Sequence, residues 1–167
     1  MAAEKLPRAD AARIVEHLTA CLESSGLVCG EDFVWAGSWR RGAEAVGDLD
    51  LVLRERPADE AFQSEQGVDL LRGGPSRAHY AYGGLQVDVW TYDSHRQRGA
   101  MLLFATGPGR LNIILRTKAQ KKGWLMNQYG VWDGDSQVDD GTEQSILELL
   151  DMDGRHLEVP AERSRYS

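Results

Sequence analysis

The most informative part of the chain is the sequence Gly37-Ser38-Trp39-Arg40-Arg41-Gly42-Ala43-Glu44-Ala45-Val46-Gly47-Asp48-Leu49-Asp50-Leu51. From residue 48 onward, polar and apolar residues alternate with the period of a half-exposed β-strand. This alternation places Asp48 and Asp50 on one face, about 7 Å apart along the strand. Carboxylates this close repel each other unless a proton or a cation intervenes, and Mg²⁺ prefers a few carboxylates together with phosphate oxygens. The pair therefore predicts a divalent-cation site.

The glycine-serine turn ahead of the aspartates predicts a phosphate contact. Gly37 allows the chain to approach a ligand closely, and Ser38 is expected to begin a helix whose free N–H groups favour phosphate. Arg41, one turn further on, can add a charge-assisted hydrogen bond. Phosphate donors and metal carboxylates on one short loop are what phosphoryl transfer requires, because its catalysis is mostly positioning and charge neutralisation.

A third carboxylate is expected from the strand that contains Asp88. This residue is an isolated acid in residues 85–90, which are otherwise expected to form a buried strand, where an unpaired acid would be costly. A neighbouring strand could bring it beside Asp48 and Asp50, so that two metal ions about 3.5–4 Å apart activate the attacking oxygen and stabilise pyrophosphate. Asp-x-Asp alone is a weak signal, commonly a solvated strand end. Its combination with the preceding Gly-Ser and the later acid is far more restrictive.

Charge is distributed unevenly along the chain. The net charge is −7, yet residues 94–132 contain no Asp or Glu. Their basic residues are Arg96, Arg98, Arg110, Arg116, Lys118, Lys121 and Lys122. Such a segregated basic segment favours a surface that follows a phosphate backbone, the alternative being a solvated helix face.

Local patterns predict an ordered series of helices and strands. Asp10 is expected to cap a helix with an apolar face through residue 22, which ends near Gly26. Glycines 83 and 84 predict a hairpin turn. We further expect strands at 33–36, 48–53, 79–82, 85–91, 124–126 and 130–132, helices at 57–63, 97–104, 111–122 and 142–150, a loop at 67–75, and a polar, partly disordered tail at 158–167.

Composition excludes some classes of protein and some kinds of site. No apolar run approaches the roughly 20 residues of a membrane span, and the polar N-terminus lacks the apolar core of a signal peptide, so we expect a cytoplasmic or DNA-associated protein without a membrane partner. Cys21 and Cys29 are expected to be reduced, structural thiols. The four histidines are scattered and do not indicate a metal site.

Together these motifs resemble the nucleotidyltransferase signature, and the segment that follows narrows the resemblance. It is similar to the X-family DNA polymerases, the relatives of DNA polymerase beta, from about residue 36 to 132 and loosely to 160–163. The residues that carry this likeness are Leu102-Leu103-Phe104-Ala105-Thr106-Gly107-Pro108, Asn112, Arg116 and Lys122-Gly123-Trp124-Leu125-Met126-Asn127-Gln128-Tyr129-Gly130.

The resemblance implies an α+β fold in two parts. Residues 1–94 would form a nucleotidyltransferase palm, a mixed β-sheet with helices on one face, and residues 95–167 a small α/β thumb subdomain with a polar C-terminal tail. The resemblance implies that the protein is a monomeric DNA polymerase that uses two Mg²⁺ ions, or Mn²⁺ in their place. It would add dNMP from dNTP to the 3′-OH of a primer-template or gapped duplex, in gap filling or end processing during DNA repair.

The resemblance also implies roles for individual residues. Asp48 and Asp50 would hold both metal ions, and Asp88 would hold the catalytic ion and accept the 3′-OH proton. The expected nucleotide contacts are Ser38, Arg41 and Gly47 at the triphosphate, Phe104 and Gly107 at the sugar, and Asn112 at the base. The expected DNA contacts are Arg116 near the template minor groove and the basic residues Arg110, Lys118, Lys121 and Lys122.

Three departures from the family pattern change what we expect. Gln86 stands where relatives often have an arginine that orients the third aspartate, so Asp88 is expected to be held less firmly. Ala105 replaces a bulky aromatic residue, which predicts weaker discrimination between deoxyribonucleotides and ribonucleotides. Too few residues precede Val34 for the lyase domain of larger relatives, so no lyase activity is expected.

Two other functions remain open from the sequence. The first is a stand-alone nucleotidyltransferase that acts on an RNA, protein or small-molecule acceptor, which needs the three acids but not Arg116 or the basic helix. The second is a non-catalytic nucleic-acid-binding module with a degenerate palm, against which the intact set of acids argues.

Overall fold

The computed structural model describes residues 4–55 and 58–167. The chain divides into two compact units, the first ending at Thr91 and the second beginning at Tyr92. The boundary expected from the sequence lies between residues 94 and 95. Each unit has its own apolar core and is described by itself.

The N-terminal unit contains a five-stranded sheet. Its strand order is β2 (Phe33–Trp35), β4 (Asp48–Arg54), β7 (Leu85–Tyr92), β6 (Arg77–Tyr82) and β5 (Asp69–Arg72). The pairs β2/β4, β7/β6 and β6/β5 are antiparallel. A separate short pair joins β1 (Leu6–Pro7) to β3 (Ala45–Val46). The register of β6 and β7 places Arg77 opposite Trp90 and His79 opposite Asp88.

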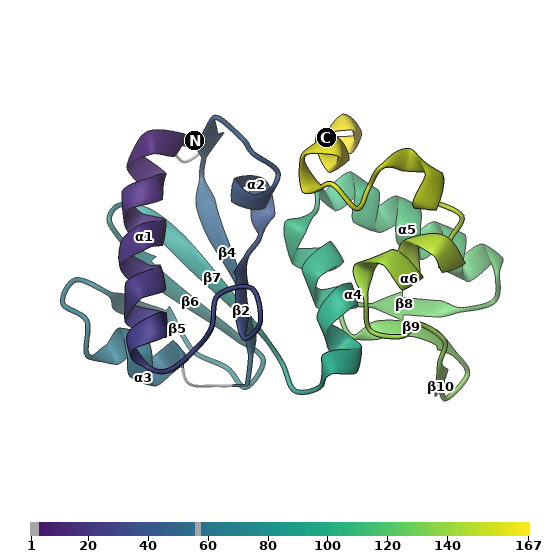
Figure 1. Ribbon diagram of the computed structural model, residues 1–167, viewed down its shortest axis with the longest axis horizontal. Helices are drawn as coiled ribbons and strands as arrows, with labels where there is room; N and C mark the ends of the chain where they lie inside the picture. The colour runs from purple at the N-terminus through teal and green to yellow at the C-terminus, as the bar shows by residue number, and fades with distance from the viewer. Residues whose placement is uncertain (1–3, 56–57) are drawn as a thin grey trace. The chain divides into compact units, whose positions relative to one another are not determined.

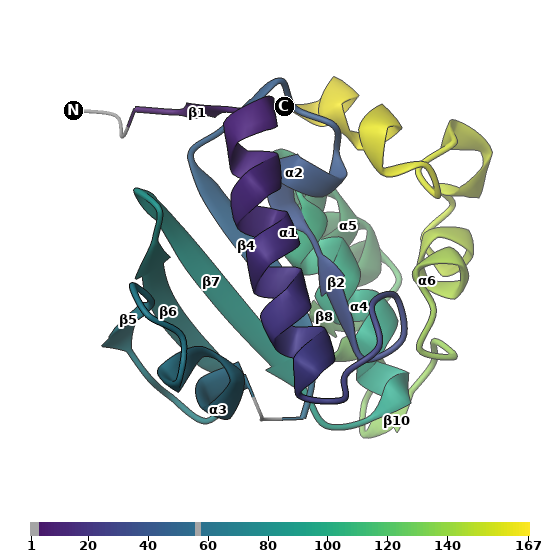
Figure 2. The same cartoon turned by 60° about the vertical axis from the view of Figure 1, so that its left-hand side comes forward.

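Helices cover one face of this sheet. Helix α1 (Arg8–Ser24) lies across the strands in Figure 2, and α3 (Ala58–Gln63) packs against α1 beside it (Figure 1). The buried strand residues Leu49, Leu51, Val87 and Val89 belong to this core. Because side chains alternate along a strand, their neighbours Asp48, Asp50 and Asp88 point to the opposite face.

Two sequence predictions for this unit are wrong. Pro7, not Asp10, occupies the N-cap of α1, and Asp10 lies in the first turn, because the pairing of β1 with β3 starts the helix earlier. Residues 69–72, expected in a loop, form β5, whose side chains are all exposed, so no apolar pattern marks the strand. Pro57, the expected first residue of α3, lies outside the described residues.

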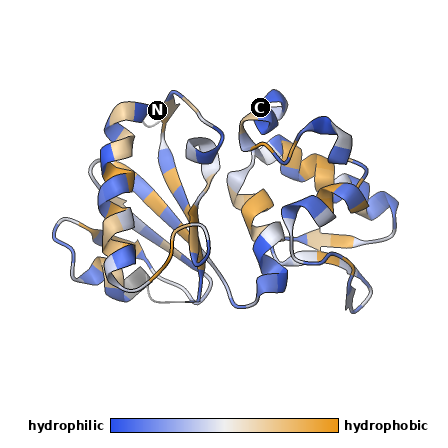
Figure 3. Cartoon of the chain, in the orientation of Figure 1, coloured by the Kyte–Doolittle hydropathy of each residue, from blue (hydrophilic) through white to orange (hydrophobic). Residues whose placement is uncertain are grey.

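The C-terminal unit packs three helices around a small antiparallel sheet. The helices are α4 (His95–Thr106), α5 (Gly109–Lys121) and α6 (Glu143–Leu149), and the strands are β8 (Leu125–Asn127), β9 (Gly130–Asp133) and β10 (Ser136–Gln137). Figure 3 shows the apolar stretches of α4 and α5 in orange. Leu103, Leu111, Leu115 and Ile146 are among the residues of its core.

The C-terminal segment is ordered, which corrects the prediction of a partly disordered tail. Residues Pro160–Tyr166 form a 3₁₀ helix whose Arg163 is fully buried. The Arg163 guanidinium makes a bidentate contact with Glu143, at 3.0 and 3.1 Å, and donates to the carbonyl of Leu157 at 2.6 Å. The segment is polar in composition, yet its Arg163 joins it to α6 through the ion pair with Glu143.

We expect Arg163→Met to lower the free energy of unfolding of the C-terminal unit by about 3 kcal/mol, because it breaks the bidentate ion pair that the buried guanidinium makes with Glu143. Arg165→Met is the matched control. Arg165 is exposed and pairs with Glu162 on the same turn, so its loss should cost less than about 1 kcal/mol. Urea unfolding followed by circular dichroism measures both values. Equal effects of the two substitutions would contradict an anchoring role for Arg163.

The α+β class predicted from the sequence is confirmed by these elements, with helices on the sheet of the first unit and a small α/β second unit. Within residues 4–55 and 58–167, no helix combines the length and the apolar character needed to cross a lipid bilayer.

Candidate active site

Asp48, Asp50 and Asp88 are carried by the neighbouring strands β4 and β7 and lie on the sheet face away from α1. Asp48 and Asp50 are two residues apart on β4, and Asp88 stands on the adjacent strand. The electrostatic influence of these carboxylates on one another, described below, shows that the strands bring them together. Alternation in the sequence predicted the common face of Asp48 and Asp50, and Asp88 was expected to join them from a neighbouring strand.

Gly37 lies directly against the second of these acids. Its φ of +60° is in the left-handed region, and a Cβ at this position would overlap Oδ2 of Asp50. Only glycine therefore fits both the backbone conformation and the space. On the other side, the indole N–H of Trp90 donates to Oδ1 of Asp50 at 3.1 Å. The glycine-serine turn and the strand acid form one packed unit.

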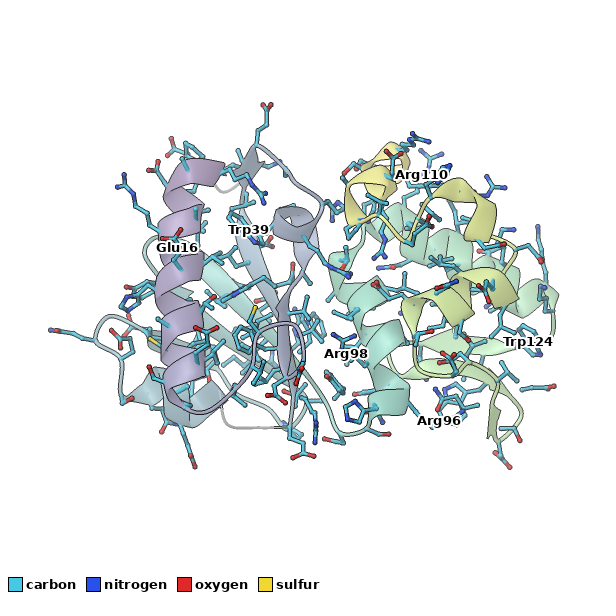
Figure 4. The ribbon with its side chains drawn as sticks, viewed as in Figure 1. Glu16, Trp39, Arg96, Arg98, Arg110 and Trp124 are labelled. Atoms are coloured by element: carbon cyan, nitrogen blue, oxygen red, sulfur yellow. The ribbon has the colours of Figure 1, made fainter. Side chains whose placement is uncertain are left out.

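The turn itself is held by α2 (Gly37–Arg40) and by Arg8. One guanidinium nitrogen of Arg8 donates to the carbonyls of Trp39 and Ala43, at 3.0 and 3.1 Å. The Arg8 guanidinium carbon lies 3.9 Å from the centre of the Trp39 ring, which is labelled in Figure 4. The backbone N–H of Ala43 donates to the carbonyl of Ser38 at 3.1 Å. These contacts position Ser38 and Arg41 next to the strand that carries the acids.

Two of the three carboxylates, Asp48 and Asp50, have raised pKa values. Burial is the main cause that raises the pKa of Asp50 from 3.8 to about 7, and the charges of Asp48 and Asp88 add to the effect, while the Trp90 hydrogen bond opposes it. Burial and the charge of Asp88 also raise the pKa of Asp48, against the lowering effect of Arg41 and Lys5. Asp48 and Asp50 are therefore poised to bind a proton or a cation.

A divalent cation suits this cluster. All three donors are hard carboxylate oxygens, the kind that Mg²⁺ prefers, and their mutual repulsion is what a bound cation would relieve. Asp48 and Asp50 are the residues that would hold such ions, together with Asp88.

Lys5 is a residue that sequence reasoning missed. The pairing of β1 with β3 brings it beside Gly47, where a Cβ on the glycine would lie 3.8 Å from Cγ of Lys5. Its charge lowers the pKa of Asp48. The sequence gives no local pattern that links Lys5 to Asp48, because the two residues are 43 positions apart.

Asp88 is held by three side chains. Oδ1 lies 2.6 Å from Nδ1 of His79 and accepts from Nε2 of Gln86 at 2.7 Å, and Oδ2 accepts from Arg77 at 3.3 Å. Arg77 also lies over the ring of Trp90, with 4.0 Å between the guanidinium carbon and the ring centre. The expectation of a loosely held Asp88 is therefore wrong, because β6 supplies the positive charge that Gln86 lacks.

In the C-terminal unit, the residues expected at the sugar and base gather at the junction of α4 and α5. The side-chain amide of Asn112 donates to the carbonyl of Phe104 at 2.9 Å, and the guanidinium carbon of Arg116 lies 5.8 Å from the Phe104 ring centre. Gly107 ends α4 with a φ of +62°. Asn112 thus has a structural role in addition to the expected contact with a base.

The basic residues differ in their availability. Arg96 and Arg98 lie on α4, and Arg110 lies on α5 (Figure 4). Arg96 donates to the carbonyls of Gln137 and Asp139 and so serves the fold. Lys122 pairs with Asp151 at 3.0 Å and lies 5.5 Å from the Trp124 ring centre. Arg110, Arg116 and Lys121 are exposed on α5, and Lys118 is half-buried.

Comparison with known proteins agrees with this description. Residues 101–163 match the family model described as the DNA polymerase beta thumb. No curated protein matches the chain by sequence.

The fold as a whole has solved counterparts. The crystal structure of Leishmania infantum polymerase beta as a ternary P/T complex is similar with a TM-score of 0.75 and 21% identity, over 96% of this chain and 77% of that one. The ternary gap complex of the same polymerase is similar with a TM-score of 0.74 and 20% identity, over 96% of this chain and 71% of that one. The chain is therefore X-family polymerase-like in fold, with a C-terminal unit that matches the DNA polymerase beta thumb.

Proposed function

We propose that the chain is a DNA polymerase that transfers dNMP from dNTP to a DNA 3′-OH, in gap filling or end processing. The observation that carries the proposal is the cluster of Asp48, Asp50 and Asp88 on one sheet face, packed against Gly37 of the glycine-serine turn. The fold shared with the Leishmania polymerase and the thumb match support it.

The N-terminal unit would supply the chemistry. Asp88 accepts the proton of the 3′-OH, and His79, Gln86 and Arg77 hold its carboxylate in one orientation. Ser38, Arg41 and Gly47 contact the triphosphate. Two Mg²⁺ ions, or Mn²⁺ in their place, would neutralise the charge of the acids and of the phosphates when bound.

The C-terminal unit would contact the nucleotide and the DNA. Phe104 and Gly107 lie at the sugar, Asn112 at the base and Arg116 at the template minor groove. The exposed Arg110 and Lys121, with Lys118, contact the DNA backbone. Lys122, which pairs with Asp151, contributes less than its charge alone suggests.

Extension of a primer in a gapped duplex with each dNTP tests the proposal. We expect Mg²⁺-dependent extension directed by the template base. The same protein should be offered an RNA primer and small-molecule hydroxyl acceptors. Transfer to these acceptors without DNA extension would favour a nucleotidyltransferase with another acceptor.

Arg77→Ala is expected to reduce the rate of extension about ten- to a hundredfold. Loss of a residue that holds a metal ligand in place typically reduces activity by this factor. Arg77 acts by positioning Asp88, so the loss should fall on kcat and leave KM for dNTP nearly unchanged, and Arg77→Lys should restore part of the rate. Arg72→Ala, at an exposed position on β5, is the control. An equal change in KM and no rescue by lysine would indicate a direct contact with substrate instead.

A further inference from the structure

A second cluster of metal-ligating side chains lies in the N-terminal unit, between α1 and the turn after α3. His17 and Cys21 are four residues apart on α1 and therefore project from the same side of the helix. Glu65 follows α3, where its backbone N–H donates to the carbonyl of Phe62 and closes the turn. The packing of α3 against α1 brings Glu65 to the two helix residues.

The three side chains already converge. Nε2 of His17 lies 2.8 Å from Oε1 of Glu65, and the thiol of Cys21 donates to Oε2 of Glu65 at 3.4 Å. One ligand atom from each residue can be chosen so that all three lie within 4.8 Å of one another. The His17 ring stacks on Tyr82, with 5.4 Å between ring centres and 10° between planes, which fixes its orientation.

The cluster is open to a ligand. His17, Cys21 and Glu65 line a hollow of about 360 Å³, together with Ser24 and Ser64. Three protein ligands beside open space are typical of zinc sites that keep a fourth position for water. Ligand bonds of about 2.0–2.3 Å in a tetrahedral site separate ligand atoms by somewhat more than 3 Å, so a bound ion requires the 2.8 Å contact between His17 and Glu65 to open slightly.

The arrangement does not suit a nucleophilic cysteine. The Cys21 thiol donates to Glu65 and not to His17, and burial, followed by Glu65, raises the pKa of this thiol. A reactive cysteine instead requires a cationic neighbour that lowers its pKa. A metal ion would replace the proton on sulfur and balance the charges of the thiolate and the carboxylate.

We propose that His17, Cys21 and Glu65 bind a zinc-type transition-metal ion at a site separate from the aspartate cluster. The thiolate and imidazole select a borderline-soft ion, whereas Asp48, Asp50 and Asp88 offer only hard oxygens suited to Mg²⁺. The proposal is independent of the polymerase activity, because the two sites lie on opposite sides of the sheet core. The sequence alone did not indicate this site, because only the fold brings Glu65 to His17 and Cys21.

Titration of the full-length protein with Co²⁺ tests the site directly. We expect one equivalent of Co²⁺ to produce a thiolate-to-metal charge-transfer band and the visible spectrum of a tetrahedral ion. Zn²⁺ should remove both signals, and excess Mg²⁺ should not. The double variant Asp48→Asn, Asp50→Asn should bind Co²⁺ with an unchanged spectrum, which separates this site from the candidate active site.

Matched variants identify the ligands. Cys21→Ser should abolish the charge-transfer band, and Cys29→Ser, at an exposed free cysteine, should retain it. His17→Gln and Glu65→Gln should weaken Co²⁺ binding at least about tenfold. Loss of a residue that only supports a metal ligand already lowers metal affinity about ten- to a hundredfold, and a ligand should matter at least as much. Circular dichroism of each variant without metal controls for folding. A band that survives Cys21→Ser, a band lost in Cys29→Ser, or only an octahedral spectrum would overturn the proposal.

Discussion

Asp88→Ala should reduce extension of a gapped duplex by at least about a thousandfold, because it removes a metal ligand and the proton acceptor together. The substitution also leaves His79, Gln86 and Arg77 without the carboxylate that they now contact. Single-turnover rates with saturating dNTP separate this loss of chemistry from weaker nucleotide binding. The effect should appear in the rate and not in the binding of DNA, which the proposal assigns to the C-terminal unit.

Asp93→Ala provides the matched control for this experiment. Asp93 is an exposed acid just beyond β7, and its side chain takes no part in the cluster. It should retain nearly full activity. Retention of more than a tenth of the wild-type rate by Asp88→Ala would remove this residue from the proposed chemistry, whereas equal losses in both variants would indicate a general effect of charge near the strand end.

The metal-free protein is expected to lose stability as the pH rises from about 4 to about 7, and Asp50→Asn should remove most of this loss. The folded state raises the pKa of Asp50 from 3.8 to about 7, so between these values it retains a proton that the unfolded chain releases. Rising pH therefore favours unfolding over this range. At about 1.4 kcal/mol for each pH unit, the full effect is on the order of 4 kcal/mol and stays constant above pH 7.

Denaturant unfolding in the presence of a chelator at pH 4, 6 and 8 measures this linkage. The exposed Asp69 on β5 supplies the control, because Asp69→Asn should leave the pH dependence of the wild type intact. Addition of Mg²⁺ at pH 8 should stabilise the wild type and Asp69→Asn more than Asp50→Asn. Parallel pH profiles for the wild type and Asp50→Asn would show that burial and repulsion at this carboxylate do not affect folding.

Much of the candidate site could be predicted from the sequence because its signals are local. Alternation along residues 48–51 places both acids on one face, and glycine at position 37 marks a tight turn. The hairpin around Gly83 and Gly84 was predicted for the same reason and is confirmed by the register of β6 and β7. In each case, neighbours along the chain specify the backbone conformation.

Contacts between distant segments could not be predicted in this way. Arg77 and His79 hold Asp88 only because β6 pairs with β7 in one register, and Lys5 reaches Asp48 only because β1 pairs with β3. A shift of one residue in either strand would point these side chains to the other face. The sequence pattern does not predict the register of either strand pair.

The sequence by itself therefore determined most of the helices and strands, the faces of the strands and the kind of donor atom that the three acids offer, since each depends on a short-range period or on residue type. Only the tertiary structure decided which charges compensate one another. In the folded chain Arg163 pairs with Glu143, Glu65 contacts Cys21, and Arg77 contacts Asp88. These partners are well separated in the sequence, and the packing of helices and the order of strands bring them together.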